Sequence, residues 1–335
     1  MPELNNNYDG RFDKDAYSLA RGFMIVQIKN KIPLQALCAP RSKAPLTAEA
    51  FLDGYLQNIW AAPKQSLNDV YRGLINSAQN AQGMPANIRK FLLSAQNLDG
   101  LPVRVINNPN SLLDDYVDIL RKVLMDFDPH AVAKKYPYTG SKNSKSLALG
   151  GQRLFDDIRC QLQTTITPRL SSKSHWIKFP KSIVSGARFL SRFNSLKEFH
   201  TYVERSNGSD EQRHHLANEI AQEVHGFGFA LARDFLKEMG YFEFSKPDVQ
   251  IKDISEILTL TPCHRDDESV FMAISRVARN ISQTPYFVDK LFWLIGSGKF
   301  YHHNIKIANN KTTFHRYARS KGYPVSERVP SHRCG

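Results

Sequence analysis

The chain has 335 residues, of which 41% are hydrophobic and 23% are charged, and its formal net charge at pH 7 is +13. The hydrophobic content excludes a largely disordered chain, and the length is enough for a sizeable core in one or two domains. A sequence pI of about 9.5 favours a polyanionic partner, because basic side chains that bind a polyanion release its counterions.

The positive charge is concentrated in two regions. Between Lys134 and Arg205 there are fourteen Lys and Arg residues against four Asp and Glu, and from Lys299 to Gly335 there are eight against one. A run of like charge is often only a solvated surface, but two such regions in one chain favour contact with nucleic acid.

Cysteine spacing and apolar runs bear on cofactors and location. The cysteines are Cys38, Cys160, Cys263 and Cys334, and no Cys-x-x-Cys pair occurs. This spacing predicts neither a metal site nor an iron–sulfur cluster, so we expect no cofactor. The first residues lack the basic and apolar regions of a signal peptide, and no apolar run reaches about eighteen residues. We therefore expect a cytoplasmic protein without a membrane partner.

Most of the chain is predicted to be helical, because apolar residues recur at helical spacing. In chain order, the predicted helices are Ala48–Trp60, Leu67–Ile75, Leu112–Phe127, Glu211–Val224, Ala230–Met239, Val249 to about Leu260, Ser269–Ile281 and Tyr286–Ile295. The best strand candidate, Leu101–Ile106, is short, so the predicted fold class is all-α. The basic, Gly- and Ser-rich segment Tyr136–Gly151 is predicted to be a flexible insertion or a DNA-contacting loop. The polar tail from Asn304 onward has weak periodicity and is expected to dock poorly or only on DNA.

The most informative stretch joins two of these helices and reads Val224-His225-Gly226-Phe227-Gly228-Phe229-Ala230. Two glycines at i and i+2 allow a tight turn with φ > 0 and leave no side chain between the backbone and a ligand. The amides that follow lie at a helix N-terminus, where they are unpaired and attract anions such as a DNA phosphate. Twenty residues after Gly228, Asp248 follows Pro247 and opens the next predicted helix.

This pattern resembles the helix-hairpin-helix superfamily of DNA glycosylases, in which a Gly-hydrophobic-Gly hairpin precedes a Pro/Val-Asp-Val pattern by about twenty residues. The resemblance implies that Asp248 is the catalytic residue. It assigns DNA contacts to the hairpin and to lysines beside the aspartate, namely Gly226, Phe227, Gly228, Ala230, Lys246 and Lys252. The alternative for Asp248 is a purely structural N-cap of the helix that follows it.

A second point of resemblance lies upstream, in Leu74-Ile75-Asn76-Ser77-Ala78-Gln79-Asn80. It looks like the Ile-Leu-Ser-x-Gln segment of these glycosylases, where polar side chains fill the gap left by an extruded base. Gln79 and Asn80 match those positions, and a polar helix C-terminus is the alternative for both. The resemblance also implies two lobes, residues 75–245 and residues 1–74 with 246–335, with the DNA cleft and Asp248 between them.

The implied chemistry is base excision. The enzyme extrudes a nucleotide, and a carboxylate beside C1′ stabilises oxocarbenium-like charge and activates water. Bifunctional relatives carry a lysine two residues after the second hairpin glycine, where this chain has Ala230, so the resemblance implies a monofunctional enzyme. Aromatic walls for the flipped base are Trp176, Phe292 and Trp293, although the last two also fit the core of an apolar helix.

Two other functions stay open. A non-catalytic helix-hairpin-helix protein would bind DNA without needing an acid at Asp248, and a bifunctional glycosylase/lyase would use a relocated lysine such as Lys246 or Lys252. The expected partner is duplex DNA with an extruded base, and the protein is expected to act as a monomer. The identity of the base, and the choice between repair and defence against modified phage DNA, do not follow from the sequence.

Overall fold

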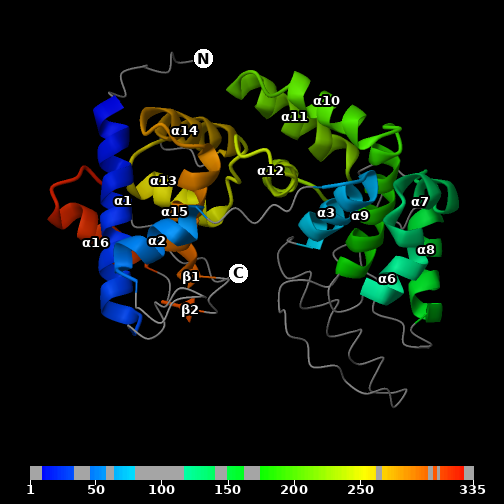
Figure 1. Cartoon of the computed structure of the whole chain (residues 1–335), viewed down its shortest axis with the longest axis horizontal. Coiled ribbons are helices and arrows are strands. Elements are labelled where there is room, and N and C mark those ends of the chain that lie inside the picture. Colours follow the sequence, from blue (N-terminus) through cyan, green and yellow to red (C-terminus); the bar gives the residue numbers. More distant parts are fainter. Residues whose placement is uncertain are drawn as a thin grey trace. The chain divides into compact units, whose positions relative to one another are not determined.

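The computed structural model describes residues 10–33, 46–57, 64–79, 117–139, 149–161, 174–261, 266–300, 305–307 and 310–327 (Figure 1). Within these ranges regular structure is almost wholly helical, and the only strands are β1 (Lys299–Phe300) and β2 (Ile305–Lys306), which pair antiparallel. The all-α prediction is therefore confirmed for the described residues. The strand predicted at Leu101–Ile106 lies outside them.

The chain divides into two compact units. The first contains residues 1–61 and 241–335, and the second contains residues 62–240. The sequence analysis placed the divisions after residues 74 and 245. Residue 74 lies inside helix α3 (Leu67–Gln79), which belongs whole to the second unit.

The first unit contains the helices α1 (Gly10–Lys31), α2 (Ala48–Gln57), α13 (Val249–Ile257), α14 (Asp267–Asn280), α15 (Pro285–Ser297) and α16 (Lys311–Ser320). Its core contains side chains from both stretches of the chain that form this unit. The rings of Phe23 on α1 and Phe314 on α16 lie 5.1 Å apart, and those of Phe51 on α2 and Phe300 on β1 lie 5.3 Å apart. The tail beyond Asn304 was expected to dock poorly, and α16 corrects this because Phe314 is fully buried.

Buried ion pairs join α1 to α14 and α16 to α13 in this unit. Asp13 on α1 is fully buried and accepts hydrogen bonds from Arg276 Nε at 2.8 Å and from Asn280 Nδ2 at 2.7 Å. Lys311 on α16 pairs with Asp253 on α13, and both side chains are buried. A buried charge that loses its partner is strongly destabilising, so these pairs hold α1 and α16 against α14 and α13.

The second unit contains α3, α6 (Val117–Val123), the 3₁₀ turn η2 (Met125–Phe127), α7 (Pro129–Lys135), α8 (Leu149–Gln161), α9 (His175–Leu190), α10 (Leu196–Arg205), α11 (Asp210–Glu223) and α12 (Phe229–Glu238). Helix α9 is central, and α3, α7, α8 and α11 pack against it. Gly186 allows α3 to approach closely, because a Cβ there would lie 2.4 Å from Leu74 Cδ2. Tyr71 of α3 also donates a hydrogen bond to the Ile183 carbonyl of α9, at 2.9 Å.

Helix α9 was not predicted, since no predicted helix lay between residues 127 and 211. Nearly every residue from Trp176 to Leu190 is buried, including Lys181, Ser182 and Ser185, so polarity does not separate a buried side of this helix from an exposed one. Pro180 lies inside it, where proline normally signals a helix end. Ser174 nevertheless caps the helix by accepting a hydrogen bond from the Trp176 amide at 3.2 Å.

Two further predictions are corrected. The helix expected over Leu112–Phe127 is broken, because α6 ends at Val123 and the backbone of Met125, Asp126 and Phe127 is left-handed, with φ of 48°, 56° and 60°. The irregular segment expected over Tyr136–Gly151 ends in helix, since α8 begins at Leu149. Gly150 allows the backbone at Pro137 to approach α8 closely, because a Cβ on Gly150 would lie 2.4 Å from the Pro137 carbonyl oxygen.

Candidate functional site

The hairpin joins α11 to α12, and its two glycines differ. Gly226 has φ +79°, a left-handed conformation that favours glycine. Gly228 has φ −100° and ψ 177°, an extended conformation open to any residue. The expectation of positive φ therefore holds for Gly226 and is wrong for Gly228. A hydrogen bond from the Phe227 amide to the Val224 carbonyl, at 3.2 Å, closes the turn between the helices.

Gly228 faces open space. A Cβ built on it meets no atom within 4 Å, and the residue is exposed. Neither its backbone conformation nor its packing requires a glycine. Helix α12 begins at the next residue, and the Leu231 and Ala232 amides bond to the Gly228 carbonyl at 3.1 Å. The absent side chain thus leaves the backbone accessible at a helix N-terminus, where an anion is favoured.

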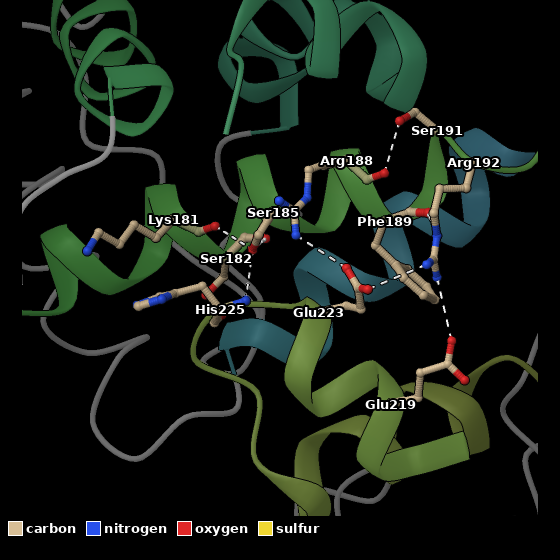
Figure 2. Close-up of polar contacts among 10 residues, drawn as sticks. All are labelled: Lys181, Ser182, Ser185, Arg188, Phe189, Ser191, Arg192, Glu219, Glu223 and His225. Atoms are coloured by element: carbon tan, nitrogen blue, oxygen red, sulfur yellow. Dashed lines mark hydrogen bonds and ion pairs between the residues drawn. The ribbon is translucent and has the colours of Figure 1, made fainter. Parts of the chain in front are cut away.

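Two serines of α9 hold the hairpin by its backbone (Figure 2). The His225 amide donates to Ser185 Oγ at 2.8 Å, and Ser182 Oγ donates to the His225 carbonyl, also at 2.8 Å. Ser182 is 2% exposed and Ser185 is fully buried. The sequence analysis did not single out either serine, since their shared face is recognisable only once α9 is known to be a helix.

An ion-pair network ties α9 to the end of α11, just before the hairpin. Glu223 lies 3.3 Å from Arg188 and 3.5 Å from Arg192, and Arg192 also approaches Glu219 at 3.9 Å (Figure 2). Partly exposed pairs of this kind contribute little stability individually. The network does show that Arg188 and Arg192, two cations of the basic region between Lys134 and Arg205, form ion pairs with carboxylates of their own unit.

Phe229 starts α12 beside the open glycine, and its ring is packed on two sides. It lies 4.6 Å from the His214 ring of α11 and 4.2 Å from the guanidinium carbon of Arg233, which is fully buried on the next turn of α12. These contacts fix the first turn of α12 relative to α11. Ala230 follows at the second position of the helix and is partly buried.

Asp248 is the N-cap of α13. Its Oδ1 accepts hydrogen bonds from the Gln250 amide at 2.8 Å and from the Ile251 amide at 3.1 Å. Among the residues that the structure describes, Oδ2 has no hydrogen-bond partner, and the residue is half-buried. Val249 beside it is 58% exposed, an apolar side chain next to the carboxylate. One oxygen is thus anchored to the helix, and the other remains available.

Helix α15 supports the segment that carries Asp248. The Lys246 amide donates to the buried Asp289 carboxylate of α15. Gly296, also on α15, allows α13 to approach, because a Cβ there would lie 2.8 Å from the Gln250 Cβ and Oε1 atoms. Fixing the chain on both sides of Asp248 is the kind of support that a precisely placed carboxylate needs.

Gln79 and Asn80 are the residues expected to fill the gap left by an extruded base. Gln79 is 1% exposed, and its Nε2 lies 3.4 Å from both the Ile75 carbonyl and Asn76 Oδ1 within its own helix. This geometry matches a polar helix C-terminus, the alternative raised for Gln79. Asn80 lies outside the described residues.

The other proposed residues lie as follows. Trp176 is 5% exposed and packs edge-on against Phe155, with ring centroids 5.4 Å apart, in the second unit. Phe292 is fully buried in the core of the first unit, and Trp293 is partly buried against the same core. Lys252 forms an ion pair with Asp267 of α14. The described structure therefore assigns packing or pairing contacts to each of these residues.

No group of three or more His, Cys, Asp and Glu side chains in the described ranges is arranged to hold a metal ion. Within the same ranges, every helix is too short or too polar to cross a membrane. Comparison with known proteins finds no matching family model, no matching curated protein and no matching solved structure.

Proposed function

We propose that this chain is a monofunctional DNA glycosylase of two lobes that acts as a monomer. It extrudes a damaged or modified base from duplex DNA and hydrolyses the N-glycosidic bond, leaving an abasic site. The observation that carries the proposal is the carboxylate of Asp248. Its Oδ1 is bonded to two amides of α13, whereas Oδ2 has no partner among the described residues.

The proposed chemistry uses the free oxygen. Cleavage of the bond between C1′ and the base leaves positive charge on the sugar, which a nearby carboxylate oxygen stabilises. The same oxygen accepts the proton of the water that adds to C1′, and the base departs with the electrons of the broken bond. Because Oδ1 is already held by the Gln250 and Ile251 amides, the carboxylate needs no reorientation during the reaction.

The hairpin supplies the anchor that base extrusion requires. Unstacking a base costs about a few kcal/mol, so the enzyme must hold the backbone of the strained duplex. The accessible backbone at Gly228 supports a phosphate contact there, and the net charge of +13 supports a polyanionic partner. Ala230 offers no amine to attack the sugar, which favours hydrolysis over a Schiff-base mechanism.

The test is a panel of duplexes incubated with the full chain, followed by mass spectrometry of the released bases. The panel contains an oxidised purine, an alkylated purine, a deaminated base and a bulky modified pyrimidine, together with phage genomic DNA. Release of one class of free base, lost in Asp248→Asn, is expected. The identity of that base then decides between repair and defence. A wild-type protein that binds no duplex even at low salt would remove DNA from the proposal.

A second candidate function is favoured by the capping geometry itself. Asp266 caps α14 by accepting a hydrogen bond from the Ser269 amide at 2.8 Å, so this chain also uses capping aspartates elsewhere. If capping were the whole role of Asp248, the protein would bind DNA through the hairpin without cleaving it. Duplex binding with no base released from any member of the panel would favour this function.

A further inference from the structure

We infer that Ser182 and Ser185 of α9 are positioning residues that hold the hairpin in the conformation that binds a DNA phosphate. The inference rests on the proposed function, because it explains how the phosphate anchor is kept ready before DNA arrives. Both serines lie outside the hairpin sequence. Their hydrogen bonds to the hairpin are with the backbone of His225.

The two serines control both peptide groups of one residue. The amide of His225 bonds to Ser185 and its carbonyl bonds to Ser182, so the peptide planes on either side of His225 are fixed. The next residue is Gly226, whose φ of +79° turns the chain. A Cβ on Gly226 would lie 3.0 Å from Ser182 Oγ, so the turn rests directly on α9. Fixing His225 therefore fixes the entry into the turn.

The local hydrogen bonds of α9 orient the hydroxyls for this task. Ser185 Oγ donates to the Lys181 carbonyl at 2.6 Å, which points its lone pairs away from its own helix and toward the His225 amide. Ser182 Oγ lies 2.9 Å from the Lys178 carbonyl and 2.8 Å from the His225 carbonyl, so its proton is shared between them. Ser185 thus accepts a hydrogen bond from the His225 amide, and Ser182 donates one to the His225 carbonyl.

Preorganisation is what makes this contact matter for binding. A hairpin that must order itself on DNA loses affinity by the free energy of ordering, whereas a hairpin already fixed does not. Loss of a hydrogen bond at His225 should raise the population of open hairpin states by up to about tenfold. Duplex affinity depends on the fraction of closed hairpin, so this factor is the upper limit of its loss, while base release at saturating DNA should change less.

The experiment compares Ser185→Ala, Ser182→Ala and wild type with a matched control, Ser275→Ala. Ser275 is 1% exposed on α14 of the first unit, and its hydroxyl has no hydrogen-bond partner among the described residues. Hydrogen exchange at the amides of 225–230 is measured by mass spectrometry. Affinity is measured with a labelled duplex that carries one tetrahydrofuran abasic-site analogue.

Ser185→Ala is expected to speed exchange at His225 and to weaken duplex binding by up to about tenfold, with Ser182→Ala acting in the same direction. Ser275→Ala should leave both quantities at wild-type values. Exchange at the wild-type rate in both Ser182→Ala and Ser185→Ala would overturn the inference and leave the proposed function standing. Faster exchange with unaltered duplex affinity would do the same. A wild-type protein that fails to bind the duplex overturns the proposed function and, with it, this inference.

Discussion

Asp248 Oδ1 lies 2.8 Å from the backbone nitrogen of Gln250, so one oxygen of this carboxylate is bound to the first turn of α13. The bond makes the capping and catalytic roles separable by experiment. Asparagine has an oxygen in the same place and caps a helix about as well as aspartate, but it lacks the negative charge. A substitution that keeps the cap and removes the charge therefore tests the charge alone.

Asp248→Asn is expected to leave the free energy of unfolding nearly unchanged and to lower the rate of base release by about a hundredfold or more. Single-turnover base release and urea unfolding measure the two quantities. The matched control is Asp266→Asn at the N-cap of α14, which should preserve both, since Asp266 also caps through a single oxygen. Wild-type base release by Asp248→Asn would assign Asp248 to capping only.

The two hairpin glycines are expected to respond differently to alanine. Gly228→Ala should weaken duplex binding with little effect on stability, because the new methyl group meets no atom within 4 Å and occupies the face that we propose contacts DNA. Gly226→Ala should lower the free energy of unfolding by about 1–3 kcal/mol, because φ +79° is strained for alanine. Fluorescence anisotropy with a labelled duplex and urea unfolding separate the two effects.

Gly54 on α2 is the control for the glycine pair, since a Cβ there also meets no atom within 4 Å. Gly54→Ala should leave duplex affinity unchanged and raise stability by about 0.5–1 kcal/mol, as expected for alanine in a helix. An unaltered affinity in Gly228→Ala would place the DNA contact elsewhere.

Borohydride is expected to trap no covalent adduct between the protein and DNA, and strand breaks should appear only after alkali or heat. Ala230 supplies no amine, and the Lys252 ammonium is paired with Asp267. Denaturing gel electrophoresis after reduction provides the measurement. A trapped adduct would contradict the hydrolytic mechanism, and its loss in Lys246→Ala or Lys252→Ala would then identify the amine.

Arg276→Met is expected to lower the free energy of unfolding by about 3 kcal/mol, because it leaves the buried carboxylate of Asp13 without its cation. The double variant Asp13→Asn with Arg276→Met should lose less, since no unpaired charge is then buried. Arg21→Met breaks a more exposed pair between Arg21 of α1 and Asp53 of α2. This variant should lower the free energy of unfolding by less than about 1 kcal/mol. Urea unfolding of the four proteins tests this order.

The sequence by itself was enough to predict the helices with one polar face. The predicted helices over Glu211–Val224 and Ala230–Met239 match α11 and α12 closely, and those over Ser269–Ile281 and Tyr286–Ile295 match α14 and α15. Their apolar residues recur at helical spacing, and this period is a property of the local sequence. The capping position of Asp248 is also local, since a residue's own helix supplies its partners.

Tertiary structure decided the features that depend on neighbours distant in sequence. Helix α9 buries polar residues such as Lys181, Ser182 and Ser185 together with its apolar ones, and its central place depends on α3, α7, α8 and α11 around it. The different roles of Gly226 and Gly228 also follow from their surroundings. One is turned against Ser182 and the other faces open space, although the sequence presents them as equivalent. The role of each glycine follows from its packing and its backbone conformation. Neither of these can be predicted from the residue type alone.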